Sequence, residues 1–594
     1  MVTDFFIALL CILLPLLAGS IVMKQPFLAW LFGSLFYFLL FLLVSFFASG
    51  ELFLDSIRLV TIVATVVGCG FLLRRSPSLK VDRRILAFLG IVLLSVISFF
   101  FVWRQTTGYP LQLNWDIYEH ITLIDILKTG KFSFFTSHLS DTFTFNSYPP
   151  FFHTMLALPL LFGGTSIGTY WWLEYFHYLG VILVTFFFVK EVFGNNRLAV
   201  FVATMTSALT FESFMVYESL FLLPQTLAAV VAIGLLTLVY RTPSVSRRTL
   251  VLGIVSLVFL HYVIGSAAAL TILFVYFFLR LPIKNSYQQV CIVVAALIFA
   301  ASIFGAFFLH WNVPGREEAQ YFNLSLGEKA GYMLDWYAGF LLFLPVGFFV
   351  MLRKPDKKRT SLLLVSFLVL AVVFSPFSYV LKYHVLSRFF LHAVVGIGAA
   401  SALLVFPRLF RPLVLVGLLT AGFLLFGSNI GRYKASLGYE GRVAHFSSAE
   451  MEAAKWLSLH SEEGMLLISE PATQYIFEAL SGVNSQGGAF MDISTRKKLI
   501  ALSYLTDPAQ VLRELRSIDD LLPSSPTVRK RIFVLSGRYT KWQDLMDSWQ
   551  ESTYYNIWRP YQRDARDNNL RDALLSQPGV HLLYQNKEVT LLTL

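Results

Sequence analysis

Three side chains of one predicted helix have the types and spacing for acid–base chemistry. Asp116, Glu119 and His120 occupy positions i, i+3 and i+4, so a helix would place them on one face. A carboxylate there could take a proton from a hydroxyl group. The three side chains also supply ligands for a divalent metal such as Mg²⁺ or Mn²⁺. The alternative is a solvated polar helix edge, because this pattern is common by chance.

His153 lies shortly downstream, after the motif Tyr148-Pro149-Pro150. The paired prolines break the chain and direct the short apolar segment that follows them. His153 is therefore placed either to face the same site or merely to cap a helix.

Two further segments carry candidate accessory groups. Glu212 and Glu218 lie in a short stretch between apolar runs, and either could assist Asp116 or bind a metal. Glu218 is the stronger candidate because a helix is expected to follow it, and the alternative is two solvated loop glutamates. His261 sits at a tight turn, where it either belongs to the site or bonds to a free helix-end carbonyl.

A basic group suited to phosphate occurs late in the apolar part of the chain. Lys382, His384 and Arg388 lie within seven residues, and Arg388 begins an apolar run. A guanidinium can bind a phosphate with two hydrogen bonds. The alternative is an arginine that extends to lipid headgroups.

The composition defines the kind of protein that positions these groups. The chain has 594 residues, of which 56% are hydrophobic and 14% are charged, against about 25% charged in soluble proteins. Its mean hydropathy is +0.66. These values exclude an ordinary soluble protein and a disordered chain, and they predict a polytopic α-helical membrane protein.

The net charge of +11 is explained by basic cytoplasmic loops, so no nucleic acid is expected as a partner. The three cysteines lie in apolar runs and form no disulfide or metal pattern. Basic residues mark alternate loops, namely Arg74, Arg75, Lys80, Arg83 and Arg84; Lys190 and Arg197; Arg241, Arg247 and Arg248; Arg280 and Lys284; Arg353, Lys354, Lys357, Lys358 and Arg359; and Arg408 and Arg411.

The apolar runs predict about 14 membrane helices. The alternation of basic loops requires that segment 150–163 does not cross, and its length fits an interfacial or re-entrant helix. The stretches 104–150, 311–335 and everything after about 430 then fall on the outer face of a cytoplasmic membrane. The predicted runs are 3–23, 27–48, 57–74, 85–103, 171–190, 197–213, 222–240, 249–262, 264–280, 289–309, 336–352, 360–378, 388–406 and 412–429.

The C-terminal part has the composition of a soluble α/β domain. Ser447 precedes an amphipathic helix through Trp456 as an N-cap. Strands are predicted at 465–469, 531–535, 580–584 and 588–593, and a helix near 473–481. The predicted division is therefore 1–84 for N-terminal extra membrane helices, 85–430 for a catalytic membrane core with the outer loop 104–150, and 431–594 for an extracytoplasmic α/β domain.

The chain resembles the GT-C superfamily of integral membrane glycosyltransferases. The resemblance rests on the segment from Trp115 to His120 with the later Gly130, on Tyr148-Pro149-Pro150, and on an outer domain beginning with the helix of Trp456-Leu457. It implies a polyprenyl-phosphate-linked sugar donor, a catalytic carboxylate at Asp116 and inversion at the sugar. It also implies an arginine at the position of Arg388.

Two departures limit what the resemblance implies. Three spans precede the helix that leads into the outer loop, and the C-terminal Trp-Trp-Asp motif of oligosaccharyltransferases is absent, so protein N-glycosylation is not expected. The sequence predicts sugar transfer to a hydroxyl group of a glycan, lipid or protein, with no required cofactor and with Mg²⁺ or Mn²⁺ left open. The alternatives are a polytopic transporter or flippase, and a non-catalytic membrane scaffold with an outer binding domain.

Overall fold

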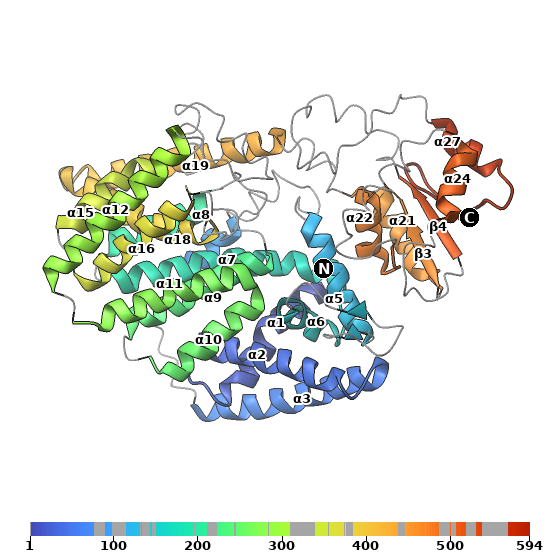
Figure 1. Ribbon diagram of the computed structural model, residues 1–594, viewed down its shortest axis with the longest axis horizontal. Helices are drawn as coiled ribbons and strands as arrows, with labels where there is room; N and C mark the ends of the chain where they lie inside the picture. The colour runs from blue at the N-terminus through green and yellow to red at the C-terminus, as the bar shows by residue number, and fades with distance from the viewer. Residues whose placement is uncertain are drawn as a thin grey trace.

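The computed structural model describes most of the chain as a bundle of apolar helices followed by a small α/β domain (Figure 1). It describes residues 2–75, 90–97, 115–130, 132–133, 143–144, 150–194, 196–210, 222–242, 245–282, 284–308, 339–353, 356–373, 375, 384–436, 446–462, 464–469, 471–485, 499, 507–517, 530–536 and 568–593.

Among the described residues, nine helices are long and apolar enough to cross a membrane. The predicted class, a polytopic helical membrane protein with a C-terminal α/β region, is therefore confirmed. The nine spans fall in α1 Val2–Ser20, α2 Pro26–Ser45, α3 Gly50–Arg75, α7 Ser166–Phe193, α9 Pro224–Arg241, α11 Tyr262–Arg280, α12 Asn285–Phe308, α18 His384–Val405 and α19 Arg411–Ser436.

Other predicted runs form shorter helices. These are α8 Arg197–Leu209, α10 Arg247–Leu260, α15 Leu344–Arg353 with the preceding 3₁₀ turn η1 Phe340–Phe343, and α16 Lys357–Val373. The run predicted at 85–103 lies mostly outside the described residues. The segment predicted not to cross forms the ten-residue helix α6 Phe151–Leu160, which is about half the length that a membrane span needs.

Four of the loop ends that the sequence assigns to one side meet on one face of the bundle, which is called the basic face. Lys358 Nζ donates to the carbonyl oxygen of Glu191 at 3.0 Å, and Arg241 Nε lies 3.9 Å from Glu191 Oε1. Lys357 Nζ donates to the carbonyl oxygen of Leu281 at 2.7 Å. The C-terminal ends of α7, α9 and α11 and the start of α16 therefore share this face.

The helix α5, Trp115–Thr129, which the sequence predicts for the outer loop, lies at the other end of α7. Lys128 Nζ at its C-terminus donates to Ser166 Oγ at the start of α7, at 3.1 Å. The short strands β1 Phe132–Ser133 and β2 Phe143–Thr144 follow α5 and pair in parallel. Since α7 has 28 residues, about 42 Å of helix separates α5 from the basic face.

The C-terminal domain contains a four-stranded sheet in the order β3-β4-β6-β5. β3 and β4 are parallel, whereas β4 with β6 and β6 with β5 are antiparallel. The elements are α21 Ser448–Leu459, β3 Met465–Ile468, α22 Pro471–Ser481, α24 Pro508–Ser517, β4 Lys530–Leu535, α27 Asn568–Leu575, β5 His581–Gln585 and β6 Thr590–Thr593.

Local signals explain the start of this domain. Ser447 Oγ accepts from Glu450 N while Glu450 Oε2 accepts from Ser447 N, so the pair forms a capping box at the start of α21. Gly482 ends α22 with a φ of +71°, a conformation that glycine adopts without a steric penalty.

The domain packs directly onto α5 through α22. Figure 1 shows α22 and α21 beside α5, with the membrane helices on its other side. The ring of Phe446, just before α21, meets the ring of Tyr118 on α5 edge-on at 6.5 Å between centroids. The C-terminal domain therefore covers the helix that carries the predicted catalytic carboxylate.

Candidate active site

α5 is anchored at its C-terminal end by a close backbone contact. Gly130 has a φ of +66°, and Gly50 N donates to its carbonyl oxygen at 2.9 Å. A Cβ at Gly130 would lie 2.6 Å from the Gly50 carbonyl oxygen. Glycine is therefore required here for two reasons, the left-handed backbone and the approach of α3.

The polar face of α5 is buried, unlike the solvated edge that the sequence left open. Glu119 is 4% exposed and His120 is 2% exposed. The apolar side is buried too, including Ile117, Ile121 and Ile124. The alternative of a solvated polar edge is therefore wrong for Glu119 and His120, because α22, α6, α7 and α3 pack against α5.

Two buried histidines meet between α5 and α6. His120 Nδ1 and His153 Nε2 are 3.0 Å apart, so one ring donates a hydrogen bond to the other. The ring of Phe152 lies edge-on to that of His120, with 5.5 Å between centroids. Since an acceptor nitrogen needs a free lone pair, at least one of the two rings is neutral.

The surroundings keep His120 neutral. Burial lowers the pKa of His120 well below its usual range, and the nearby His153 and His261 lower it further. A neutral imidazole has one donor and one acceptor nitrogen, so it can hold a neighbouring polar group by a hydrogen bond.

His261 is the N-cap of α11. Its Nδ1 accepts from Ile264 N at 3.3 Å, and the residue is 5% exposed. It thus bonds to a free helix N–H and not, as the sequence suggested, to a carbonyl. His261 also lowers the pKa of His120, so a proton on one ring disfavours a proton on the other.

Several predicted site residues are only partly described. Asp116 lies in the first turn of α5 and His384 begins α18, but their side chains are outside the described residues. Glu212, Glu218 and Lys382 lie outside the described residues altogether.

Arg388 lies inside the protein and holds the end of α8. Its side chain is 0% exposed, and Nη2 donates to the carbonyl oxygens of Ser207 and Thr210, each at 2.8 Å. His392 Nε2, one turn further along α18, lies 3.0 Å from Thr210 Oγ1. A cation at a helix C-terminus also interacts favourably with the helix dipole. The arginine thereby fixes the point where the segment carrying Glu212 and Glu218 begins.

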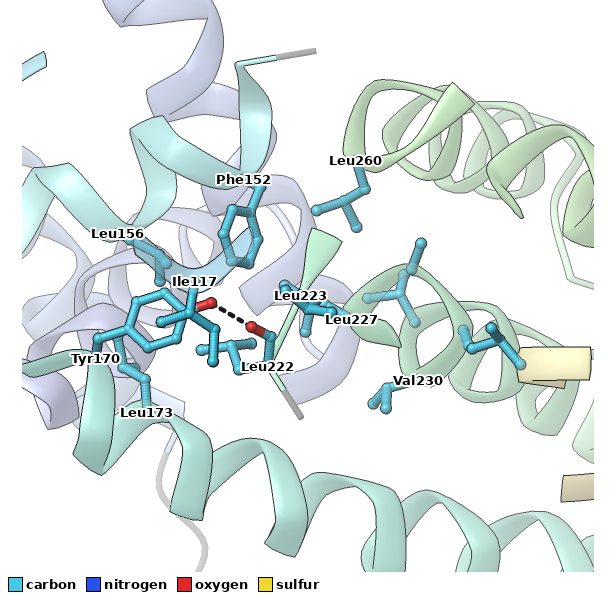
Figure 2. Close-up of a cluster of buried hydrophobic side chains, with 14 of the residues drawn as sticks. Ile117, Phe152, Leu156, Tyr170, Leu173, Leu222, Leu223, Leu227, Val230 and Leu260 are labelled. Atoms are coloured by element: carbon cyan, nitrogen blue, oxygen red, sulfur yellow. Dashed lines mark hydrogen bonds between the residues drawn. The ribbon is translucent and has the colours of Figure 1, made fainter. Parts of the chain in front are cut away.

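Glu174 on α7 is a buried carboxylate that the sequence analysis did not single out. It is 2% exposed, and neither carboxylate oxygen has a hydrogen-bond partner among the described residues. One turn before it, Tyr170 Oη donates to the carbonyl oxygen of Leu222 (Figure 2). One turn after it, Tyr178 Oη donates to the carbonyl oxygen of Ala208 at 2.8 Å. The available signal was an acidic residue inside an apolar run, which is rare without a function.

Ala208 and Leu222 lie on either side of the segment 211–221 in the chain. Because Glu174 is one helical turn from both Tyr170 and Tyr178, it lies on the face of α7 that contacts Leu222 and Ala208. An unpaired buried carboxylate is costly. Glu174 is therefore a candidate to meet a substrate group or a residue of that segment.

The metal hypothesis rests on residues that are only partly described. Within the described part of the chain, no three His, Cys, Asp or Glu side chains are grouped to hold a metal ion. The set of Asp116, Glu119 and His120 includes a side chain outside that part, so it stays a prediction.

Comparison with solved structures finds two enzymes with partial likeness. The chain is similar to the Archaeoglobus fulgidus oligosaccharyltransferase in the apo form, with 13% identity over 77% of this chain and 71% of that chain and a TM-score of 0.47. The same enzyme tethered to an acceptor peptide gives 11% identity, 84% and 73% coverage and a TM-score of 0.46. Arabinofuranosyltransferase AftD from Mycobacteria gives 15% identity, 87% and 40% coverage and a TM-score of 0.44.

By these descriptions both are glycosyltransferases, the enzyme class of the superfamily that the sequence resembles. Because these TM-scores are below 0.5, the function of the two enzymes is not assigned to this chain on structural similarity. A function has to be argued from the residues of the site.

No curated protein matches the sequence. Residues 56–391 match the sequence model of a family described as a family of unknown function. This range contains α5, α6 and the histidine pair, and it ends just after Arg388. Because it spans more than half of the 594 residues, the chain belongs to this family of unknown function, DUF6541.

Proposed function

We propose that the protein is a GT-C-type glycosyltransferase of the cytoplasmic membrane, with its C-terminal domain outside the cytoplasm. It would move a sugar from a polyprenyl-phosphate donor to a hydroxyl group of a glycan, lipid or protein. The observation that carries the proposal is the hydrogen-bonded pair of His120 and His153, buried together with Glu119, on the two helices that follow and include the predicted position of Asp116. This pair lies at the end of the bundle opposite to the basic face, which the charge rule assigns to the cytoplasm.

In this reaction the acceptor oxygen attacks the anomeric carbon while the bond from that carbon to the phosphate oxygen breaks. Asp116 takes the proton of the acceptor hydroxyl, and the lipid phosphate leaves from the opposite face of the sugar, which inverts the anomeric carbon. His120, four residues after Asp116 on α5, and its partner His153 are proposed to orient Asp116. The chemistry requires no cofactor, and Mg²⁺ or Mn²⁺ at Asp116, Glu119 and His120 would help to neutralise the leaving phosphate.

Arg388, with Lys382 or His384, is proposed to stabilise the leaving phosphate of the donor. Nη2 of Arg388 also holds the end of α8. Glu218 and Glu212 would extend from that end toward the substrate.

One observation favours the alternative of a transporter. Glu174 is a buried carboxylate without a described hydrogen-bond partner inside an apolar helix, as in helices that move ions or substrates. A scaffold, in contrast, gives no reason for the buried acid and imidazole groups on α5 and α6.

The test uses the full-length protein in proteoliposomes with a panel of polyprenyl-phosphate sugars, radiolabelled in the sugar. A glycosyltransferase releases polyprenyl phosphate and transfers label to an acceptor or to water, whereas a transporter accumulates intact label inside the vesicle. Transport without cleavage of any donor would refute the proposal.

A further inference from the structure

A long apolar groove runs between membrane helices beside the site. It has a volume of about 480 Å³ and is lined by residues of α1, α2, α6, α7 and α9. On α7 it is bordered by Leu173, His177, Gly180 and Val184, and on α9 by Leu227 and Val230. Because its walls are membrane helices, its occupant must be soluble in the bilayer.

The groove is as long as the apolar part of a bilayer. Its lining on α7 extends from Leu173 to Glu191, which is about 27 Å along a helix with a rise of 1.5 Å per residue. The hydrocarbon core of a membrane is about 30 Å thick. The groove therefore matches a hydrocarbon chain that lies across the membrane.

One end of the groove adjoins the candidate active site. Met155 and Leu156 line it and lie within one turn of His153 on α6. Figure 2 shows Leu156, Leu173 and Leu222 of the groove grouped with Ile117 and Phe152, the neighbours of Asp116 and His153 in the chain.

The other end is polar and lies on the basic face. Gln25, Glu191 and Arg241 line it, and the last two form an ion pair with 3.9 Å between Nε and Oε1. The active site and the basic face thus lie at opposite ends of one apolar path.

A glycine keeps the path open in its middle. An added Cβ at Gly180 would meet only Val230 Cγ1, at 3.8 Å. At Gly234, by contrast, an added Cβ would lie 2.4 Å from the ring of Phe27. The ring of Phe27 therefore covers α9 at Gly234, whereas the space in front of Gly180 is free of described atoms except that methyl group.

We infer that this groove binds the polyprenyl chain of the lipid-linked donor, with the sugar phosphate at the α6 end; the inference rests on the proposed function. A chain lying in the groove brings its polar head to the histidine pair and its tail toward the basic face. A bulk phospholipid has no reason to place its head at that buried site. The helices α1 and α2, which precede the residues that match the family, then form one wall of the donor site.

The test compares two glycine variants of the full-length protein. Gly180→Leu places a side chain in the groove. Gly417→Leu is the matched control, because it lies on another apolar helix, α19, where an added Cβ meets nothing within 4 Å. Both variants are checked for folding by their melting temperatures.

Binding is read without turnover, by photocrosslinking a long-chain polyprenyl phosphate that carries a diazirine at mid-chain and mapping the labelled peptides. The inference predicts labels on α7 and α9 in the wild type and in G417L, and at least fivefold less label there in G180L. With a reactive donor, G180L is expected to raise the KM for the long-chain form about tenfold, and to raise that for a two-isoprene form much less.

Labels confined to helices that do not line the groove, or equal labelling in G180L and G417L, would overturn the inference while leaving the proposed function in place. Equal competition by a diacyl phospholipid would overturn the assignment to the donor. Specific labelling in the groove without cleavage of any donor would instead count against the proposed function and support a lipid site in a different kind of protein.

Discussion

His120 Nδ1 and His153 Nε2 lie 3.0 Å apart, although 33 residues separate them in the chain. This contact joins the outer-loop helix α5 to the short helix α6, which follows the Pro149-Pro150 pair. It turns two separate sequence features into one buried site beneath the C-terminal domain.

The first prediction concerns the dependence of stability on pH through His120. Its folded-state pKa is lowered, so the unfolded chain takes up a proton that the folded protein does not. Stability should fall as the pH drops below about 6.5, by up to about 1.4 kcal/mol per pH unit. Melting temperatures at pH 7.5 and pH 5.5 should show a smaller acid-induced loss in H120Q than in the wild type. An identical loss in both proteins would contradict the neutral state of His120.

The second prediction concerns Glu478 on α22. Burial raises the pKa of its carboxyl to about 7, although Ser485 donates two hydrogen bonds to it. Because the folded-state pKa is raised, stability should decline as the pH rises from about 4.5 to 7, by up to about 1.4 kcal/mol per pH unit.

E478Q keeps a neutral side chain of the same shape and should melt higher than the wild type at pH 8 but not at pH 4.5. E452Q, an exposed glutamate on α21, is the control and should melt as the wild type does. If E478Q melts lower than the wild type at pH 8, the carboxylate is stabilising and the raised pKa is wrong.

The third prediction concerns Glu174. Replacing a buried, unpaired carboxylate by an amide lowers its burial cost, so E174Q should stabilise the protein by about 1 kcal/mol or more. If Glu174 contacts a substrate, sugar transfer should fall at least tenfold in the same variant. Thermal melts and donor cleavage are measured together, and a stabilised variant with full activity would remove Glu174 from the site.

The fourth prediction concerns Arg388. R388A removes the donor that holds the carbonyl oxygens of Ser207 and Thr210, so it should cost about 1–3 kcal/mol of stability. It should also weaken binding of the lipid-linked donor more than binding of the acceptor. R388K keeps the charge but lacks the planar guanidinium, and it should recover part of the stability. Equal affinities for the donor in R388A and the wild type would exclude any role at the phosphate.

Local signals were sufficient for much of the architecture. The Ser447 capping box, the short helix after Pro149-Pro150 and the four C-terminal strands follow from patterns within a few residues. The basic residues in the loops correctly predicted that the C-terminal ends of α7, α9 and α11 lie on one face, because Lys and Arg are enriched in the loops on the cytoplasmic side.

The burial of the site could not be predicted in this way. α5 is amphipathic in sequence, yet it is packed against α6 and against α22, which lies more than 300 residues later in the chain. The carbonyl partners of Arg388 come from α8, and no local pattern indicates them. The burial of the Glu174 carboxylate without a hydrogen-bond partner among the described residues likewise depends on the packing of α7 against its neighbours.

In the proposed reaction, Asp116 takes the proton of the acceptor hydroxyl during sugar transfer. The most direct measurement is cleavage of the lipid-linked donor by D116N, compared with D55N, whose aspartate on α3 is 70% exposed. We expect D116N to fold, to melt near the wild type and to lose sugar transfer at least a thousandfold, while D55N keeps full activity. Full transfer by folded D116N would show that Asp116 is not the base.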